Sequence, residues 1–154
     1  MPGYYPVFLQ LRGRLCVVVG GGEVAQRKVE ALVEAGARVR VISPSLSPRL
    51  SQLAASGQVG AEPRPYATGA LKGAFLAIAA TDDPEANRQV VREARRRRVL
   101  LNVVDEPRAC SFIMPSVVRR GELVLAISTG GLSPALSRKV REDLEAHFGA
   151  EYAL

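Results

Sequence analysis

A glycine-rich segment follows directly on an apolar run near the start of the chain. Residues 15–19 (LCVVV) lead into residues 20–25 (GGGEVA), which fit the pattern G-x-G-x-x-G/A. At a junction between strand and helix, Gly20 would permit a tight turn, Gly22 would let the backbone approach a pyrophosphate, and Ala25 would allow close packing of the helix on the sheet. The helix N-terminus would add free N–H groups and a positive dipole end. The segment therefore predicts dinucleotide binding rather than a tight turn alone.

The sequence is less informative about which dinucleotide would bind. An acidic residue about 20 positions after such a fingerprint usually binds the ribose diol of NAD. Here Ser43, Pro44 and Ser45 occupy that place. Serine hydroxyls could bind the adenosine ribose, whereas Arg40 or Arg49 nearby could bind the 2′-phosphate of NADP. The residues alone leave NAD and NADP open.

Polar residues follow two later apolar runs. Thr81 begins one such group, and residues 102–105 (Asn-Val-Val-Asp) form the other. In open parallel sheets, ligands bind outside the carboxyl ends of the strands. Asp105 would lie where a nicotinamide ring is expected, so it could accept a proton while hydride leaves the same substrate. The alternative is that Asp105 only caps a turn before Pro107.

A second glycine-rich loop, residues 128–134 (STGGLSP), leads into a helical pattern. It is either an anion-binding loop or a plain helix cap.

The two cysteines, Cys16 and Cys110, lie in apolar surroundings, and no histidine is near Cys110 in the sequence. Reduced structural thiols are therefore expected rather than a nucleophile. With one histidine in the chain, no metal site is expected.

The elements that would position these groups alternate in type. Apolar runs at 15–19, 38–42, 75–80 and 99–104, with a weaker one at 59–62, read as strands, and the stretches 23–35, 47–56 and 84–97 read as helices. Such alternation predicts an α/β protein with a Rossmann-type, doubly wound parallel sheet. We expect the first helix to turn Val24, Leu32 and Val33 inward and to end at Gly36.

The pattern changes after Asp105. Residues 112–119 and 122–128 are strand-like runs separated by Arg120 and Gly121, which predicts a hairpin. A final helix is expected to begin with Ser133 as its N-cap and Pro134 at its first position. Its apolar stripe would consist of Leu136, Val140, Leu144 and Phe148. We therefore expect two domains, a dinucleotide-binding domain over 1–110 and a hairpin with a helix over 111–154 that packs as an appendage or an oligomer interface.

Composition limits the class of protein. An apolar content of 47% in 154 residues is enough for a core and argues against disorder. No apolar run is long enough to span a membrane, and the N-terminus is not a signal peptide, so we expect a cytoplasmic protein. The net charge of +6 suggests an acidic ligand such as a phosphate or carboxylate. Residues 95–98 are all arginine, but no aromatic residues are interleaved to stack bases, so no nucleic-acid partner is expected.

Taken together, several blocks resemble the siroheme synthase family, in particular its precorrin-2 dehydrogenase and sirohydrochlorin ferrochelatase module. They are residues 5–8 (YPVF), 15–28, 77–83 with Asn87, 102–105, 111–115 (SFIMP) and 128–134. The resemblance covers nearly the whole chain in unbroken order. It implies NAD-dependent oxidation of precorrin-2 to sirohydrochlorin in sirohaem biosynthesis, an oxidoreductase reaction. In bifunctional members a lyase step follows, in which ferrous iron is inserted as a substrate.

The resemblance also implies roles for individual residues. Asp105 matches the aspartate implicated in both steps. The residues expected at the NAD site are Gly20, Gly22, Glu23, Val24, Ser43, Pro44, Ser45 and Thr81. The residues expected to bind the tetrapyrrole, which carries eight carboxylates, are Asn102, Ser128, Gly130, Gly131 and Ser133. Residues 112–128 match the dimerisation segment, which implies a homodimer whose active site uses residues of both chains.

One departure and one alternative accompany this hypothesis. Family modules continue beyond the last helix into a further helical region, whereas this sequence ends at Leu154. The missing region therefore bears on the expected iron insertion more than on the expected dehydrogenase step. The residues do not indicate which metal ion would be inserted. The alternative, of a different class, is a regulatory module that senses NAD without turning it over.

Overall fold

The computed structural model describes residues 3–153, which divide into two compact units. One unit is Val7–Phe112, and the other is the chain from Ile113 onward together with the segment up to Pro6. No helix within residues 3–153 combines the length and the apolar character needed to cross a bilayer.

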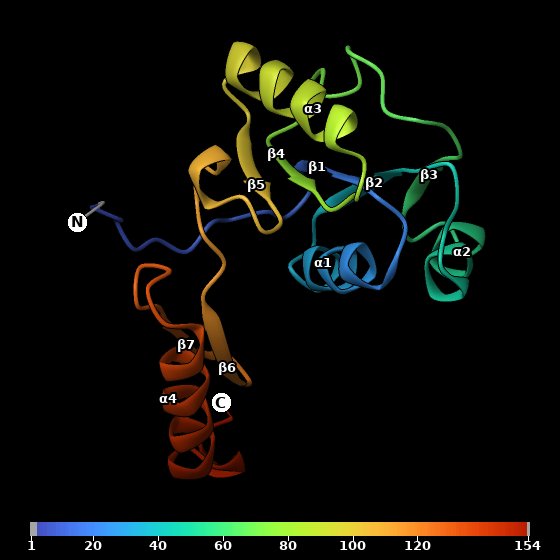
Figure 1. Cartoon of the computed structure of the whole chain (residues 1–154). Helices are drawn as coiled ribbons and strands as arrows, with labels where there is room; N and C mark the ends of the chain where they lie inside the picture. Colours follow the sequence, from blue (N-terminus) through green and yellow to red (C-terminus); the bar gives the residue numbers. More distant parts are fainter. Residues whose placement is uncertain (1–2, 154) are drawn as a thin grey trace. The chain divides into compact units, whose positions relative to one another are not determined.

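A five-stranded parallel sheet forms the centre of the larger unit (Figure 1). Its strands are β1 (Leu15–Val19), β2 (Arg38–Ile42), β3 (Gly60–Glu62), β4 (Leu76–Ala79) and β5 (Leu100–Val103), in the order β3-β2-β1-β4-β5. This order places the switch point between β1 and β4, where Rossmann folds bind dinucleotides. The predicted α/β class and doubly wound sheet are confirmed. Strands β4 and β5 are each one residue shorter at both ends than predicted.

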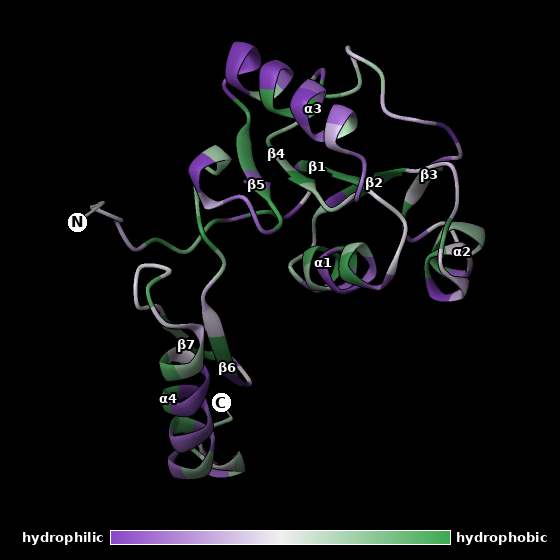
Figure 2. Ribbon diagram, in the orientation of Figure 1, coloured by the Kyte–Doolittle hydropathy of each residue, from purple (hydrophilic) through white to green (hydrophobic). Residues whose placement is uncertain are grey.

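Helices cover both faces of this sheet. Helices α1 (Glu23–Glu34) and α2 (Pro48–Ala55) pack on the face that receives Cys16 and Val18, and α3 (Pro84–Arg97) packs on the face that receives Val17 and Val19. Alternate residues of β1 thus enter two cores because strand side chains alternate in direction. Figure 2 shows the sheet strands as mainly hydrophobic and the outer surface of α3 as hydrophilic. Strands β1, β4 and β5 are therefore largely buried on both faces, as their continuous apolar runs predicted. The prediction was wrong for part of β2, where Arg38 is exposed and Arg40 is half-buried.

Helix α1 differs from the prediction in which residues it buries. Its C-terminal end is as predicted, because Gly36 has a φ of +77° and donates to the carbonyl of Val33 at 2.9 Å. However, the buried residues of the helix are Ala25, Val29 and Leu32. The prediction that Val24 points inward was wrong: its side chain is 36% exposed. Val24 lies one position, about 100°, around the helix from Ala25, which takes the place against the sheet.

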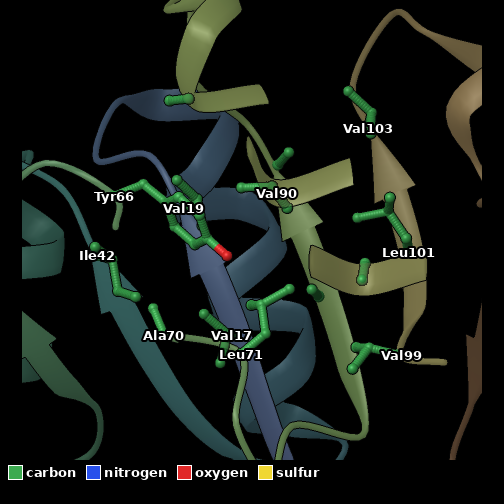
Figure 3. Packing of buried hydrophobic residues seen from close by; sticks show 14 residues of the cluster. Val17, Val19, Ile42, Tyr66, Ala70, Leu71, Val90, Val99, Leu101 and Val103 are labelled. Atoms are coloured by element: carbon green, nitrogen blue, oxygen red, sulfur yellow. The ribbon is translucent and has the colours of Figure 1, made fainter. Parts of the chain in front are cut away.

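An irregular segment, residues 63–75, connects β3 to β4 across the α3 face. Tyr66 and Leu71 from this segment fill the core between β1 and α3 (Figure 3). A buried carboxylate on α3 holds the segment: Glu93 accepts hydrogen bonds from the Tyr66 hydroxyl, from the Gly69 N–H at 2.9 Å and from Nε of Arg97 at 2.6 Å. The connection from β3 to β4 thus consists of this segment, held by the Glu93 network, in place of the helix that such a crossover usually contains.

The second unit contains a hairpin and a helix. Strands β6 (Ser116–Arg120) and β7 (Leu123–Ile127) pair antiparallel across Gly121 and Glu122, which confirms the predicted hairpin. The first strand was predicted to begin at 112 but begins at Ser116. Pro115 has no N–H to donate to a ladder, and Phe112 still belongs to the larger unit, where its carbonyl accepts from the Asn102 side chain.

Helix α4 (Pro134–His147) begins as predicted, with the Ser133 hydroxyl accepting from the Leu136 N–H at 3.2 Å. Its apolar stripe is only partly covered. Val140, Leu144 and Phe148 are half-buried, but Leu136 is 53% exposed and Ser137 is the buried residue of the helix. Within a single chain the stripe is therefore covered at its last three positions and open at its first.

Candidate functional site

Gly20 forms the turn between β1 and α1 at the switch point of the sheet. Its φ is +129°, a conformation that L side chains rarely adopt. A Cβ at this position would collide with the carbonyl oxygen of Ala80, the residue that follows β4. Glycine is required here so that the backbones following β1 and β4 can approach each other.

The next two glycines have different surroundings. A Cβ at Gly21 would overlap the carbonyl oxygen of Ser45 and lie 2.7 Å from the Ser43 hydroxyl, so Gly21 is needed for contact with the loop after β2. A Cβ at Gly22 would meet nothing within 4 Å. Open space therefore lies beside Gly22, where the sequence predicted that a pyrophosphate approaches. Sequence reasoning assigned no role to Gly21, although three consecutive glycines were the available signal.

The N-terminus of α1 has no side-chain cap. Gly22 is the N-cap residue and has no side chain to act as an acceptor, whereas Ser47, Asp83 and Ser133 cap α2, α3 and α4 through their side chains. The N–H groups of Glu23 and Val24 donate to no atom of residues 3–153. Such free N–H groups and the helix dipole favour an anion. The residues present therefore fit the pyrophosphate of a dinucleotide.

Gly22 provides a test of this site that should spare the fold. Gly22→Ala should weaken NADH binding by about tenfold, because a methyl group would occupy the space that the phosphates need. The backbone at Gly22, with φ −86° and ψ −167°, is one that alanine adopts without strain, so the free energy of unfolding should change little. Fluorescence titration with NADH measures the first quantity and urea unfolding the second. Gly60→Ala, in β3, is the control, and equal NADH binding by both variants would contradict the assignment.

The loop after β2 carries the three residues expected at the adenosine ribose. Ser43 is buried, and its hydroxyl donates to the Ser45 carbonyl at 2.7 Å, so this side chain shapes the loop. Pro44 and Ser45 are exposed. Their exposure leaves them available to a ligand, and their contact with the ribose remains a prediction.

Arg40 and Arg49, the two arginines considered for a 2′-phosphate, both contact other residues of the chain, and Arg40 is held more firmly than Arg49. Nη2 of Arg40 donates to the Ala70 carbonyl at 2.7 Å, and its Nε lies 3.5 Å from the Glu62 carboxylate, so this side chain is part of the fold. Arg49 pairs with Glu30 at 3.0 Å, but both side chains are substantially exposed. An exposed pair of this kind is worth at most about 1 kcal/mol. Arg40 is therefore unsuited to a 2′-phosphate, whereas Arg49 could be released.

Thr81, expected beside the nicotinamide, is held in place by a hydrogen bond from a residue of α3. Its carbonyl accepts from Nδ2 of Asn87 at 3.1 Å, and its hydroxyl accepts from the Asp83 N–H at 3.2 Å. Asn87 is 9% exposed, and its Oδ1 is buried with no hydrogen-bond partner in the described residues. The loop after β4 is thus held in one place at the switch point.

Asp105 follows β5 on a strained backbone. Its φ is +63°, in the left-handed region that few residues other than glycine, asparagine and aspartate enter. The side chain is exposed, and its carboxylate accepts no hydrogen bond from residues 3–153. The turn is held instead by the Glu106 N–H, which donates to the Val103 carbonyl at 3.2 Å. The alternative that the Asp105 side chain caps this turn finds no support in the structure, and strain of this kind is found at functional sites.

The two cysteines have structural environments. Burial raises the pKa of the Cys16 thiol to about 11, so it stays protonated at neutral pH. Sγ of Cys110 accepts from the Val103 N–H at 3.1 Å and lies 3.3 Å from the Val103 carbonyl, although this residue is half-buried rather than buried. Cys110 therefore supports the turn that carries Asp105.

Asn102, expected at the substrate, is buried in β5. Its Nδ2 donates to the Phe112 carbonyl at 3.2 Å, which ties β5 to the returning chain. This bond does not use Oδ1, so contact with a ligand stays a prediction. No group of three His, Cys, Asp or Glu side chains within residues 3–153 is arranged to hold a metal ion.

The other residues expected at the substrate lie in the second unit. Ser128 accepts from the Gly130 N–H at 3.0 Å, and the Thr129 hydroxyl accepts from the Ser133 N–H at 2.9 Å, so much of this loop is bonded to itself. Gly130 and Gly131 have φ values of +66° and +82°. Ser128 and Gly131 also line a cavity of about 290 Å³ with Met114, Arg138 and Arg141. Ser133 is a helix cap, and the loop as a whole borders a cavity with two arginines.

Comparison with known proteins places the chain in a family. Residues 7–116 match a family described as "Putative NAD(P)-binding", and residues 120–147 match one described as "Sirohaem biosynthesis protein central". The structure of SirC, precorrin-2 dehydrogenase, matches with a TM-score of 0.85 at 30% identity, over 97% of this chain and 74% of that one. The chain belongs to the family of siroheme synthase N-terminal regions.

Curated siroheme synthases agree with this placement. The siroheme synthase of Methylobacillus flagellatus is 48% identical over 147 residues, which are 96% of this chain and 32% of that protein. Siroheme synthase 1 of Serratia proteamaculans is 50% identical over 143 residues, which are 93% of this chain and 30% of that protein. The chain thus spans about a third of the length of these relatives. The resemblance to the siroheme synthase family is confirmed.

The NAD(P)-binding match has a direct structural counterpart. It runs from 7 to 116 and so includes the whole of the larger unit, with the glycine turn, the uncapped start of α1 and Asp105. The larger unit of this siroheme synthase relative is therefore an NAD(P)-binding domain, as the glycine fingerprint predicted.

Proposed function

We propose that this chain oxidises precorrin-2 to sirohydrochlorin with NAD as the hydride acceptor. The observation that carries the proposal is the free carboxylate of Asp105, which follows β5 in the same domain as the dinucleotide site at β1 and β4. The similarity to SirC, precorrin-2 dehydrogenase, supports the choice of substrate.

The proposed roles of the residues follow from their positions. When NAD is bound, its nicotinamide ring would be the hydride acceptor. The N–H groups at the start of α1 would bind its pyrophosphate, the loop from Ser43 to Ser45 would contact the adenosine ribose, and Thr81 would border the nicotinamide. Asp105 would remove the proton that accompanies loss of hydride, because its carboxylate is exposed and free to accept it. Asn102, Ser128, Gly130, Gly131 and Ser133 remain proposed substrate contacts.

NAD rather than NADP is the proposed cofactor. Arg40 is held by Ala70 and Glu62 and is not free to bind a 2′-phosphate, and Arg49 would have to give up its ion pair with Glu30 to do so. Ser45 and Pro44 offer an uncharged surface in its place. A cytoplasmic location is part of this proposal.

Two further parts of the proposal concern iron and assembly. Ferrous iron would be a second substrate, with Asp105 accepting protons displaced from the macrocycle. The homodimer would form through residues 112–128. In support, Met114 of this segment is exposed, and the second unit also exposes the large apolar side chains of Leu132 and Leu136. Sedimentation equilibrium would test the dimer, and a further spectral change that needs both iron and protein would test metal insertion.

Anaerobic spectroscopy tests the proposed reaction. The purified protein, supplied with precorrin-2 and NAD, should produce the sirohydrochlorin absorbance spectrum, and NADP should support a much lower rate. The NAD-sensing alternative predicts binding of NADH with no conversion of precorrin-2. Conversion at the same rate without any dinucleotide would contradict the proposal.

A further inference from the structure

The first turn of α3 carries a buried asparagine that has no part in the proposed reaction. The Asn87 side chain is 9% exposed, whereas Glu85 and Arg88 of the same turn are exposed to solvent. Nδ2 of Asn87 donates to the Thr81 carbonyl at 3.1 Å. Its Oδ1 is buried and accepts no hydrogen bond from any described residue. Asn87 is thus a buried amide with only its donor side bonded.

Such a half-bonded amide is a cost to the fold. A buried acceptor without a donor is destabilising, and nearly all buried polar atoms in proteins are bonded. A leucine would have the same branched shape as Asn87 and would bury no polar atom. The contact that an asparagine makes here and a leucine cannot make is the hydrogen bond to Thr81, in the loop after β4.

This loop lies against the glycine turn of the dinucleotide site. A Cβ at Gly20 would overlap the Ala80 carbonyl oxygen and would lie 3.2 Å from the Thr81 nitrogen. The Thr81 N–H donates to no described residue, and the Thr81 hydroxyl accepts a hydrogen bond from the Asp83 N–H without donating one to a described residue. Thr81 therefore has two unused donors, its N–H and its hydroxyl, beside the turn that follows β1.

The position of β4 relates these donors to one half of the dinucleotide. In Rossmann domains the residues that follow β2 bind the adenosine ribose, so the adenosine half lies on the β2 side of β1. The sheet order β3-β2-β1-β4-β5 places β4 on the other side of β1. The nicotinamide half, whose ribose and carboxamide carry oxygen acceptors, would therefore meet Thr81.

We infer that Asn87 is a positioning residue for the nicotinamide half of the dinucleotide. Its amide fixes the Thr81 carbonyl and thereby the orientation in which the Thr81 N–H and hydroxyl meet the ligand. Because the Asn87 side chain is buried, the ligand would contact Thr81 and not Asn87. The inference rests on the proposed function, since it places Thr81 at the nicotinamide half of NAD.

Binding of two ligands to Asn87→Leu tests the inference. The variant should bind NADH about fivefold more weakly, the effect of losing one neutral hydrogen bond. ADP contains the adenosine and the pyrophosphate but no nicotinamide half, so its affinity should stay within about twofold. The KM for NAD should rise by about fivefold, while the KM for precorrin-2 stays within about twofold. Isothermal titration calorimetry measures the two affinities and anaerobic kinetics the two KM values.

A second variant and an unfolding measurement separate this role from a structural one. Asn87→Ala removes the same hydrogen bond without adding a branched side chain, and it should also weaken NADH while leaving ADP unchanged. The urea midpoint of Asn87→Leu should stay close to that of the unmodified protein, because the variant loses one bond but also removes an unbonded buried acceptor. Equal losses of NADH and ADP affinity in both variants would show a purely structural role and would overturn the inference.

Gln89 provides a matched control on the same helix. It also carries an amide, but its Nε2 donates to the exposed Glu85 carboxylate at 3.3 Å and not to the loop after β4. Gln89→Leu should therefore change the affinity for either ligand by less than about twofold. If Gln89→Leu loses as much NADH affinity as Asn87→Leu, any apolar substitution on α3 has this effect and the inference is wrong.

The outcomes also separate this inference from the proposed function. If the unmodified protein oxidises precorrin-2 with NAD and Asn87→Leu binds NADH equally tightly, Asn87 has no positioning role and the proposed function stands. If the unmodified protein binds no NADH, the proposed function fails and the inference fails with it.

Discussion

Asp105→Asn should lower kcat for precorrin-2 oxidation by about 10²- to 10⁴-fold, the usual contribution of a general base, while NAD affinity stays within about twofold. Asparagine keeps the size of the side chain and tolerates the φ of +63° found at this position, so the turn should keep its conformation. It cannot take up the proton that the Asp105 carboxylate would accept. Anaerobic steady-state kinetics and a separate NADH titration measure the two quantities.

Asp82→Asn is the matched control for this variant. Asp82 is an exposed carboxylate in the loop after β4, and no role in the reaction is assigned to it. Its replacement should leave kcat within about twofold. If Asp105→Asn keeps a third or more of the activity, or if Asp82→Asn loses as much as Asp105→Asn, the proton acceptor lies elsewhere.

Glu93→Ala should lower the free energy of unfolding by about 3–5 kcal/mol, the usual effect of removing one partner from a buried charged network. The Glu93 side chain has 0% exposure, and its loss leaves the Tyr66 hydroxyl and the Gly69 N–H without an acceptor and Arg97 without its ion pair. Tyr66 belongs to the segment that closes one core of the sheet (Figure 3). Urea unfolding followed by circular dichroism measures the change.

Glu85 provides the comparison for Glu93 on the same helix. It also accepts hydrogen bonds from arginines, Arg88 and Arg92, but it is exposed to solvent. Glu85→Ala should therefore cost far less stability than Glu93→Ala. Similar losses in the two variants would show that Glu93 acts only as one of many surface charges.

The same network predicts how stability depends on pH. Burial raises the pKa of Glu93, but hydrogen bonds from Tyr66, Arg97 and Gly69 outweigh it and hold the pKa below its usual value. The stability that Glu93 contributes is therefore present above its unfolded-state pKa, near about 4.3, and is lost as the pH falls through its lower native value. The melting temperature should fall less steeply below about pH 4 in Glu93→Gln than in the unmodified protein. Identical slopes would contradict this linkage.

The parts of the fold that the sequence predicts best are those that local signals determine. Strand β1 has the predicted limits because a continuous apolar run is typical of a strand buried on both faces, and β2 has them because arginine and valine alternate along most of it. Gly36 and Ser133 mark helix ends because each supplies what the backbone needs there, a left-handed conformation or a side-chain acceptor. The dinucleotide site was predictable for the same reason, since its donors are backbone groups at a position that glycines mark.

The features that could not be predicted depend on contacts between distant residues. Glu93 lies in an arginine-rich helix and looks like a surface charge until Tyr66, 27 positions earlier, is placed against it. The need for glycine at position 21 comes from Ser45, a residue of the next loop. Periodicity also misplaced Val24, because it does not determine which neighbouring residue touches the sheet.

A single turnover under anaerobic conditions tests the central claim most directly. Excess protein and NAD would be mixed with limiting precorrin-2, and NADH and sirohydrochlorin would be followed in the same absorbance record. We predict one NADH for each sirohydrochlorin, formed at one rate by the unmodified protein and strongly slowed in Asp105→Asn. Binding of NAD with no NADH formed, or equal rates for the two proteins, would contradict the account.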